Sequence, residues 1–129
     1  MQAEEYPRVD EFPFYVPGLD VRRGLELFEG ETEDYISALQ SFVRNAPNTV
    51  AAMRGVTEGK LAEYEINAHG LKSICGYICA ENVRTVAYEL ELLAKAGDFS
   101  GVSERNDGFL DDLGSFIEKL GAALEEYSG

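Results

Sequence analysis

The sequence predicts an all-α domain: an antiparallel, up-and-down four-helix bundle with one short extra helix at its N-terminal end. Four long segments carry apolar residues at helical spacing, and short turns separate them. No segment shows the sustained alternation of apolar and polar residues that a half-buried strand requires. At 129 residues, the chain is also long enough to bury a core without disulfide support.

An extended lead-in is predicted for residues 1–18, and the helical domain for residues 19–128. The lead-in contains Pro7, Pro13 and Pro17, and proline disfavours helical conformation in the residue before it. Several aromatic side chains lie among these prolines. We expect them to rest against the domain.

The first two helices follow one another closely. Asp20 can cap a short helix over residues 21–28, and Gly30 can end it in a left-handed conformation. The second helix begins with acidic side chains, which the helix dipole favours in a first turn. Pro47 predicts a kink or a break in this second helix near Asn45.

Three further helices complete the domain. The third is predicted over 60–79 and the fourth over 81–96, where Gly97–Asp98 stops it. The last helix reaches about Tyr127, and its predicted start falls within 102–107. The third helix buries one apolar stripe, which consists of Leu61, Tyr64, Ala68, Leu71, Cys75 and Ile78.

The charge balance argues against several classes of partner. Lys and Arg number 11 against 24 Asp and Glu, which gives a formal net charge of -13. A chain this acidic lacks the positive surface that nucleic acids and anionic membranes bind. It has no apolar run of membrane-spanning length and no visible signal peptide. We therefore expect a soluble, cytoplasmic, monomeric protein.

The chain contains a single histidine, His69. This excludes metal centres that need two imidazoles from one chain. A mixed site of His69 with Cys75 and Cys79 is disfavoured, because helical geometry turns both thiols toward or beside the apolar stripe and away from the imidazole. We predict reduced core thiols and no metal site.

His69 is predicted to point into solvent. At about 100° per residue it lies opposite the apolar stripe of its helix. On its own face are Glu65 one turn before, Lys72 and Ser73 one turn after, and Gly76 two turns after. No acid stands three or four positions from Lys72 to hold it in an ion pair within the helix.

Small and apolar residues surround this imidazole. Gly70 and Gly76 lower helix stability, so close approach of another group is a reason for their presence. That group is either a neighbouring helix or a docking partner. Ile66 and Tyr77 lie 60° to 80° from His69 by the same approximate geometry. They either form a docking patch or are buried against the second helix.

These residues resemble a known family. The stretch 68–73 (A-H-G-L-K-S), then Gly76, Cys79–Ala80, Glu89–Leu90–Glu91 and Gly97–Asp98, is similar to the pattern of histidine-containing phosphotransfer (HPt) domains. Gly24–Leu25 and the stretch 30–42 also look like the family's entry helix and second helix, so the resemblance covers about 110 of the 129 residues. Two positions depart from it, because serine replaces the usual glycine after the lysine and cysteine replaces the glycine of a Gly-Ala pair.

The resemblance implies a phosphorelay intermediate of two-component signal transduction. His69 would accept a phosphoryl group from the aspartyl phosphate of a receiver domain and pass it to another receiver. Lys72 would stabilise the charge of that group. The chain would be a phosphocarrier without autokinase activity or a cofactor of its own, with Mg²⁺ held by the receiver. The candidate docking residues are Glu65, Ile66, Ser73, Gly76 and Tyr77.

Other interpretations are weaker. The dimerisation helices of sensor kinases place an acid after the histidine and a proline five residues on, where this chain has Gly70 and Ile74. A degenerate HPt-like module that binds a receiver or kinase without being phosphorylated is the main alternative. Intact His69 and Lys72 argue against it. The Met1 start and the complete set of helices favour a free-standing protein over a piece of a hybrid kinase.

Overall fold

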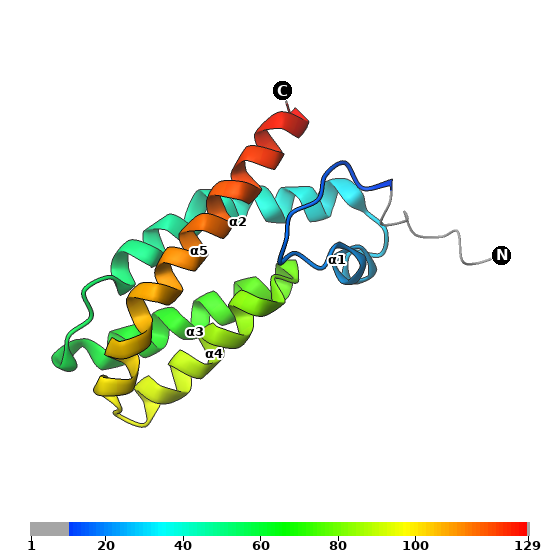
Figure 1. Cartoon of the computed structure of the whole chain (residues 1–129). Coiled ribbons are helices and arrows are strands. Elements are labelled where there is room, and N and C mark those ends of the chain that lie inside the picture. Colours follow the sequence, from blue (N-terminus) through cyan, green and yellow to red (C-terminus); the bar gives the residue numbers. More distant parts are fainter. Residues whose placement is uncertain (1–10, 129) are drawn as a thin grey trace.

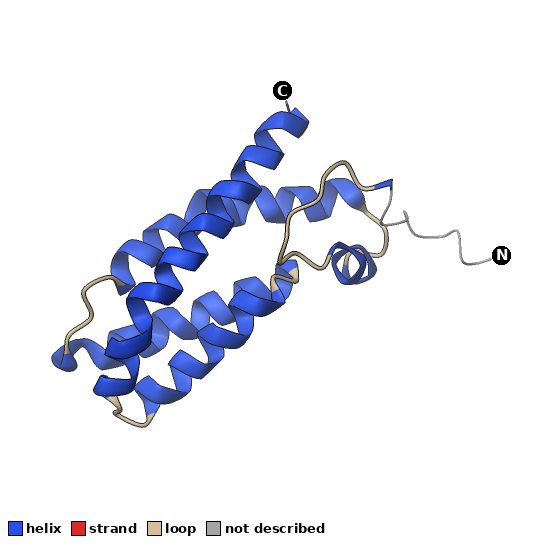
Figure 2. Cartoon of the chain, in the orientation of Figure 1, coloured by secondary structure: helices blue, strands red, loops and turns tan. Residues whose placement is uncertain are grey.

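A computed structural model describes residues 11–128, and within that range it is helical and has no strands (Figure 2). The predicted all-α class is therefore confirmed, while residues 1–10 of the predicted lead-in lie outside the described range. The elements are α1 (Val21–Leu27), α2 (Thr32–Met53), the short 3-10 helix η3 (Glu58–Lys60), α3 (Leu61–Ile78), α4 (Glu81–Lys95) and α5 (Phe99–Ser128).

The five α-helices pack together around one core (Figure 1). Helix α2 contacts α3 and α5, α4 also contacts α3 and α5, and α1 lies against α2. All five contribute fully buried or nearly fully buried side chains, among them Leu25, Tyr35, Phe42, Tyr64, Leu71, Leu90, Leu110 and Leu113. Across residues 11–128, no helix combines the length and apolar composition that a membrane crossing needs.

Tyr35 ties the first three helices together. Its hydroxyl donates a hydrogen bond of 2.9 Å to the carbonyl of Ile78, the last residue of α3. Its ring fills the space in which a side chain at Gly24 of α1 would lie.

Asp20 accepts a hydrogen bond from the Arg23 amide, as an N-cap should. The predicted cap of α1 is thus confirmed.

The C-cap of helix α3 is Cys79, which replaces a glycine of the pattern described above. Cys79 adopts a left-handed conformation with φ of 66°. Glycine reaches this conformation without strain, whereas a residue with a side chain adopts it less readily. Here the Cys79 side chain is buried and its carbonyl accepts the Asp20 amide at 2.9 Å. The turn between α3 and α4 therefore forms with a cysteine in the left-handed position.

The lead-in before α1 is partly packed on the domain. Phe12 and Val16 are buried, and the Phe12 ring centroid lies 4.8 Å from that of Phe14 and 5.8 Å from that of Tyr35. Tyr15, in contrast, is 80% exposed. The expectation that the aromatic residues of the lead-in rest against the domain thus holds for Phe12 and Phe14 but not for Tyr15.

Of the kink or break predicted near Asn45, the break does not occur, because α2 continues through Pro47. Pro47 is exposed, so solvent can satisfy the carbonyl that loses its helical donor. The predicted start of the last helix is wrong. Helix α5 begins at Phe99 and not within 102–107. Its early start follows from Asp98, whose Oδ1 accepts the Gly101 amide at 2.9 Å and so caps the first turn.

Candidate functional site

His69 projects from α3 on the face opposite the core. The buried residues of α3 are Tyr64, Ala68, Leu71, Cys75 and Ile78, which are five of the six predicted for the apolar stripe. The His69 side chain, in contrast, is 60% exposed. The predicted orientation of this imidazole is therefore confirmed.

A buried carboxylate on α4 holds the His69 ring. Glu91 Oε2 lies 2.8 Å from His69 Nδ1, and Glu91 as a residue is only 9% exposed. The short turn between α3 and α4 brings the two positions opposite each other, because they lie at similar distances from it along the two helices. This contact fixes the plane of an otherwise exposed ring.

The same carboxylate binds the cation of the site. Glu91 Oε1 forms an ion pair of 2.8 Å with Lys72 Nζ. The Lys72 ammonium also lies 4.9 Å from the centroid of the Tyr88 ring, within the range of a cation–π contact. Lys72 thus has partners on α4, although it has none within its own helix.

These contacts keep Glu91 ionised. The contact with Lys72 is the largest cause that lowers the pKa of Glu91, and the hydrogen bond with His69 acts in the same direction. Burial acts in the opposite direction, but the pKa of Glu91 is lowered overall. At neutral pH the group facing His69 is therefore a carboxylate.

An ionised carboxylate dictates the tautomer of the imidazole. A carboxylate can only accept hydrogen bonds, so Nδ1 of His69 must carry the proton that is shared with Glu91. In the neutral ring the lone pair then resides on Nε2. The arrangement presents a nucleophilic nitrogen at the surface with a carboxylate behind the ring and an ammonium group beside it.

The remaining predicted residues surround His69 without contacting its ring in any hydrogen bond or ion pair. Glu65 is half-buried, and the carboxylate at Nδ1 belongs to Glu91. Ser73 is exposed. Ile66 and Tyr77 are 70% and 54% exposed. Burial against α2, the alternative left open for the last two, is therefore wrong.

Gly76 is covered by a side chain from α4. A Cβ atom at this position would lie 3.1 Å from Cδ of Arg84. The Arg84 guanidinium is held by Glu81, with 2.8 Å between Nε and Oε1. The absence of a side chain at Gly76 therefore makes room for the aliphatic part of Arg84.

The two cysteines belong to the core. Cys75 and Cys79 are free and buried, as predicted. Burial is the main cause that raises the pKa of Cys75 to about 12 and that of Cys79 to about 11. Both thiols are therefore protonated at neutral pH, a state unsuited to metal binding or nucleophilic attack. Among residues 11–128, no cluster of metal-ligating side chains occurs.

Glu91 is the residue of this candidate site that the sequence does not predict. It forms part of the Glu89–Leu90–Glu91 motif, but its contact with His69 was not predicted. One signal was present. Glu91 lies four residues after Ala87 and three before Ala94, both buried, so it shares their buried side of α4. A charged residue there needs a charged or polar partner across the interface.

Comparisons of the chain with protein-family models, curated proteins and solved structures found no match.

Proposed function

We propose that this chain is a phosphorelay intermediate of two-component signal transduction, a phosphocarrier without autokinase activity. The observation that carries the proposal is the exposed His69 ring, whose Nδ1 is bound to a buried, ionised Glu91 that also holds Lys72. The site thus combines a nucleophilic nitrogen with two charged groups that phosphoryl transfer needs nearby. The Glu91 carboxylate faces the ring, and the Lys72 ammonium can face the phosphoryl oxygens. The resemblance of α3 and α4 to HPt domains supports the same function.

In the forward step, Nε2 of His69 attacks the phosphorus of a receiver's aspartyl phosphate. An N–P bond forms while the P–O bond to the aspartate breaks, and its electron pair leaves with the aspartate carboxylate. The ring keeps its Nδ1 proton and becomes positively charged. Glu91, 2.8 Å from Nδ1, stabilises this charge. Attack by a second aspartate carboxylate reverses the step and returns the electron pair to Nε2.

Lys72 neutralises charge on the transferred group. The phosphoryl oxygens are anionic, and a lysine ammonium on a flexible four-carbon chain can follow them. Before transfer this ammonium is held between Glu91 and the Tyr88 ring. An arriving phosphoryl group competes with Glu91 for Lys72. The carboxylate is then left free to stabilise the positive His69 ring.

The proposal includes an architecture and a partner. Contacts of α2 and α4 with both α3 and α5 support an antiparallel, up-and-down four-helix bundle, with α1 as the extra helix. The partner is a receiver domain of a response regulator or hybrid kinase, which brings the aspartate and its Mg²⁺. We infer that the chain works as a monomer in the cytoplasm and needs no cofactor of its own.

The decisive experiment is phosphoryl transfer from purified receiver domains that carry labelled aspartyl phosphate. Wild-type protein should acquire acid-labile, alkali-stable label, and His69→Gln should acquire none while keeping its helical circular dichroism. Labelling of the His69→Gln variant would refute the site. If receivers bind the wild type but none labels it, the chain is the degenerate binding module instead.

A further inference from the structure

A small hollow lies beside His69, between α2 and α3. Its volume is about 170 Å³. Ser41, Asn45 and Thr49 of α2 contribute polar atoms, while Leu71 and Ile74 of α3 contribute apolar surface. No charged residue lines it, although 27% of the chain is charged. An uncharged side chain can therefore enter without stripping water from an ionised group.

Gly70 keeps this hollow open. It lies within α3 and lines the hollow directly. A Cβ atom at Gly70 would meet no atom within 4 Å, so contact with a neighbouring helix does not require a glycine there. A glycine inside a helix lowers its stability relative to alanine. Packing within the chain therefore does not account for this glycine, and the space at the mouth of the hollow stays free.

The hollow lies where a partner of His69 must dock. Gly70 follows His69 directly, and Ile74 is about 7.5 Å further along the helix axis than His69. A stable interface buries about 800 Å² on each partner. A partner centred on His69 therefore covers this hollow. Helical geometry places the exposed Ile66 and Tyr77 on the Gly70 side of His69, which extends the apolar surface toward α2.

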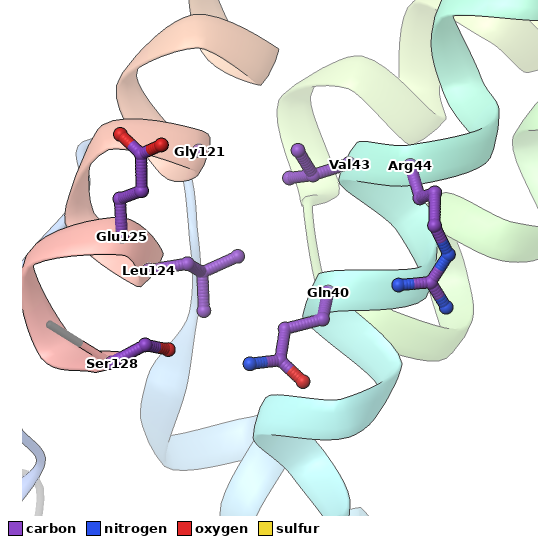
Figure 3. Close-up of a pocket in the computed structure, with 7 residues that line it drawn as sticks. All are labelled: Gln40, Val43, Arg44, Gly121, Leu124, Glu125 and Ser128. Carbon is purple, nitrogen blue, oxygen red and sulfur yellow. The ribbon is translucent and has the colours of Figure 1, made fainter.

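A larger hollow elsewhere has a different character (Figure 3). It measures about 650 Å³ and is lined by α2 and α5 alone. Its lining includes the charged residues Arg44 and Glu125, which would have to be desolvated or paired when it is filled. The hollow at Gly70, in contrast, combines an uncharged lining with a position next to the proposed phosphoacceptor.

We propose that the receiver that meets His69 inserts one apolar side chain into the hollow at Gly70, so that Gly70 helps to determine which receivers can dock. This inference rests on the proposed function. The occupant is a protein side chain because small-molecule pockets usually measure about 300 Å³ or more. An apolar anchor in a pocket near the centre of an interface commonly carries much of its binding energy.

The test fills the hollow and measures docking separately from chemistry. Gly70→Leu places a side chain in the hollow, and Gly108→Leu on α5 is the matched control. Both glycines are exposed, lie inside helices and have open space at the Cβ position. Calorimetry gives the Kd for the receiver that labels the wild type, and phosphoramidate serves as a small donor for direct labelling of His69.

Gly70→Leu should raise the Kd for the receiver about tenfold or more, while Gly108→Leu leaves it within about twofold. Gly108→Leu should react with phosphoramidate at the wild-type rate, and labelling of Gly70→Leu by phosphoramidate shows that its His69 is still reactive. An unchanged Kd for Gly70→Leu would overturn the inference, yet the relay function would stand. Failure of phosphoramidate and every receiver to label the wild type would overturn the proposed function and this inference with it.

A graded variant guards against a folding artefact. Gly70→Ala adds a single methyl group, so it should raise the melting temperature slightly and the Kd less than leucine does. If Gly70→Leu weakens binding but also lowers the melting temperature, the alanine variant decides. A rise in Kd with an unreduced melting temperature supports occupation of the hollow. An unchanged Kd in Gly70→Ala, with Gly70→Leu destabilised, counts against it.

Discussion

At the residue scale, Glu91 links His69 and Lys72, the two groups that the proposed mechanism brings to the phosphoryl group. One oxygen of its carboxylate accepts a hydrogen bond from Nδ1 of His69, and the other oxygen pairs with the Lys72 ammonium. Each contact depends on the negative charge of the carboxylate, and each lowers its pKa. The ring orientation and the resting position of the ammonium are thus set by one buried residue.

The lowered pKa of Glu91 predicts a pH-dependent contribution to stability. Because the pKa is lower in the folded state than in the unfolded state, the contribution is present above about pH 4.3, the ordinary glutamate value, and is lost as the pH falls through the folded value. The difference in unfolding free energy between wild type and Glu91→Gln should therefore narrow from pH 7 to pH 3. Urea denaturation of both proteins at each pH measures this difference. A difference independent of pH would contradict the ion pair.

Lys72 allows a prediction about rate. In Lys72→Ala, no ammonium group is available for the phosphoryl oxygens, so single-turnover transfer from the receiver should slow about 10-fold to 100-fold. Binding of the unphosphorylated receiver should persist, since the substitution changes a side chain that is only 23% exposed. Lys60→Ala is a suitable control, because Lys60 lies in η3 and pairs with Glu63. Transfer at the wild-type rate would remove Lys72 from the mechanism.

At the element scale, a buried polar network joins three helices. The Tyr64 hydroxyl of α3 donates to Asn106 Oδ1 of α5 at 2.8 Å, and Asn106 Nδ2 donates to the Met53 carbonyl at the end of α2, also at 2.8 Å. Burial raises the pKa of Tyr64 to about 12, so its hydroxyl keeps its proton at neutral pH. The network fixes how these helices meet.

Removing the Tyr64 hydroxyl should destabilise the protein, because it leaves a buried oxygen without a hydrogen-bond donor. Tyr64→Phe leaves Asn106 Oδ1 buried without a donor, which should lower the free energy of unfolding by about 1–3 kcal/mol. Tyr88→Phe serves as the control, because Tyr88 is 44% exposed, and should change stability by less than about 0.5 kcal/mol. Urea denaturation at pH 7 compares them. Equal stability of the two variants would refute the network.

The sequence predicts most of the helices because their apolar stripes are regular, and the exposed face of His69 follows from that periodicity. Its errors have local causes. Gly97–Asp98 was interpreted as the end of one helix, whereas Asp98 also caps the next one. Pro47 alone does not break a helix that is packed on its neighbours. The Glu91 contact connects two helices, and a pattern read along one helix does not reveal which residues meet across an interface.

At the scale of the whole molecule, charge is the dominant feature. The chain carries a formal net charge of -13, so repulsion between like charges opposes the compact state. The ion pairs of the described residues lie mostly at the surface, where each contributes about 0–1 kcal/mol. Dissolved salt screens both kinds of interaction. We expect it to weaken the repulsion between the excess acidic groups more than it weakens the attraction within the surface ion pairs.

This balance predicts stabilisation by salt. Raising NaCl from about 0.01 M to about 0.15 M shortens the screening length from about 30 Å to about 8 Å, which should raise the melting temperature by a few degrees. Differential scanning calorimetry at pH 7 measures the shift. A melting temperature that falls over this range would mean that the surface ion pairs outweigh the repulsion.

The contact between the Lys72 ammonium and the Tyr88 ring also offers a position for a fluorescent probe. The chain contains no tryptophan, so Tyr88→Trp would introduce a single indole fluorophore directly beneath the ammonium group. Indole emission responds to a nearby charge, and the proposed mechanism moves this charge away from the ring when the phosphoryl group arrives. The emission of that one residue would then follow the phosphorylation state of His69 in real time, without a radioactive label.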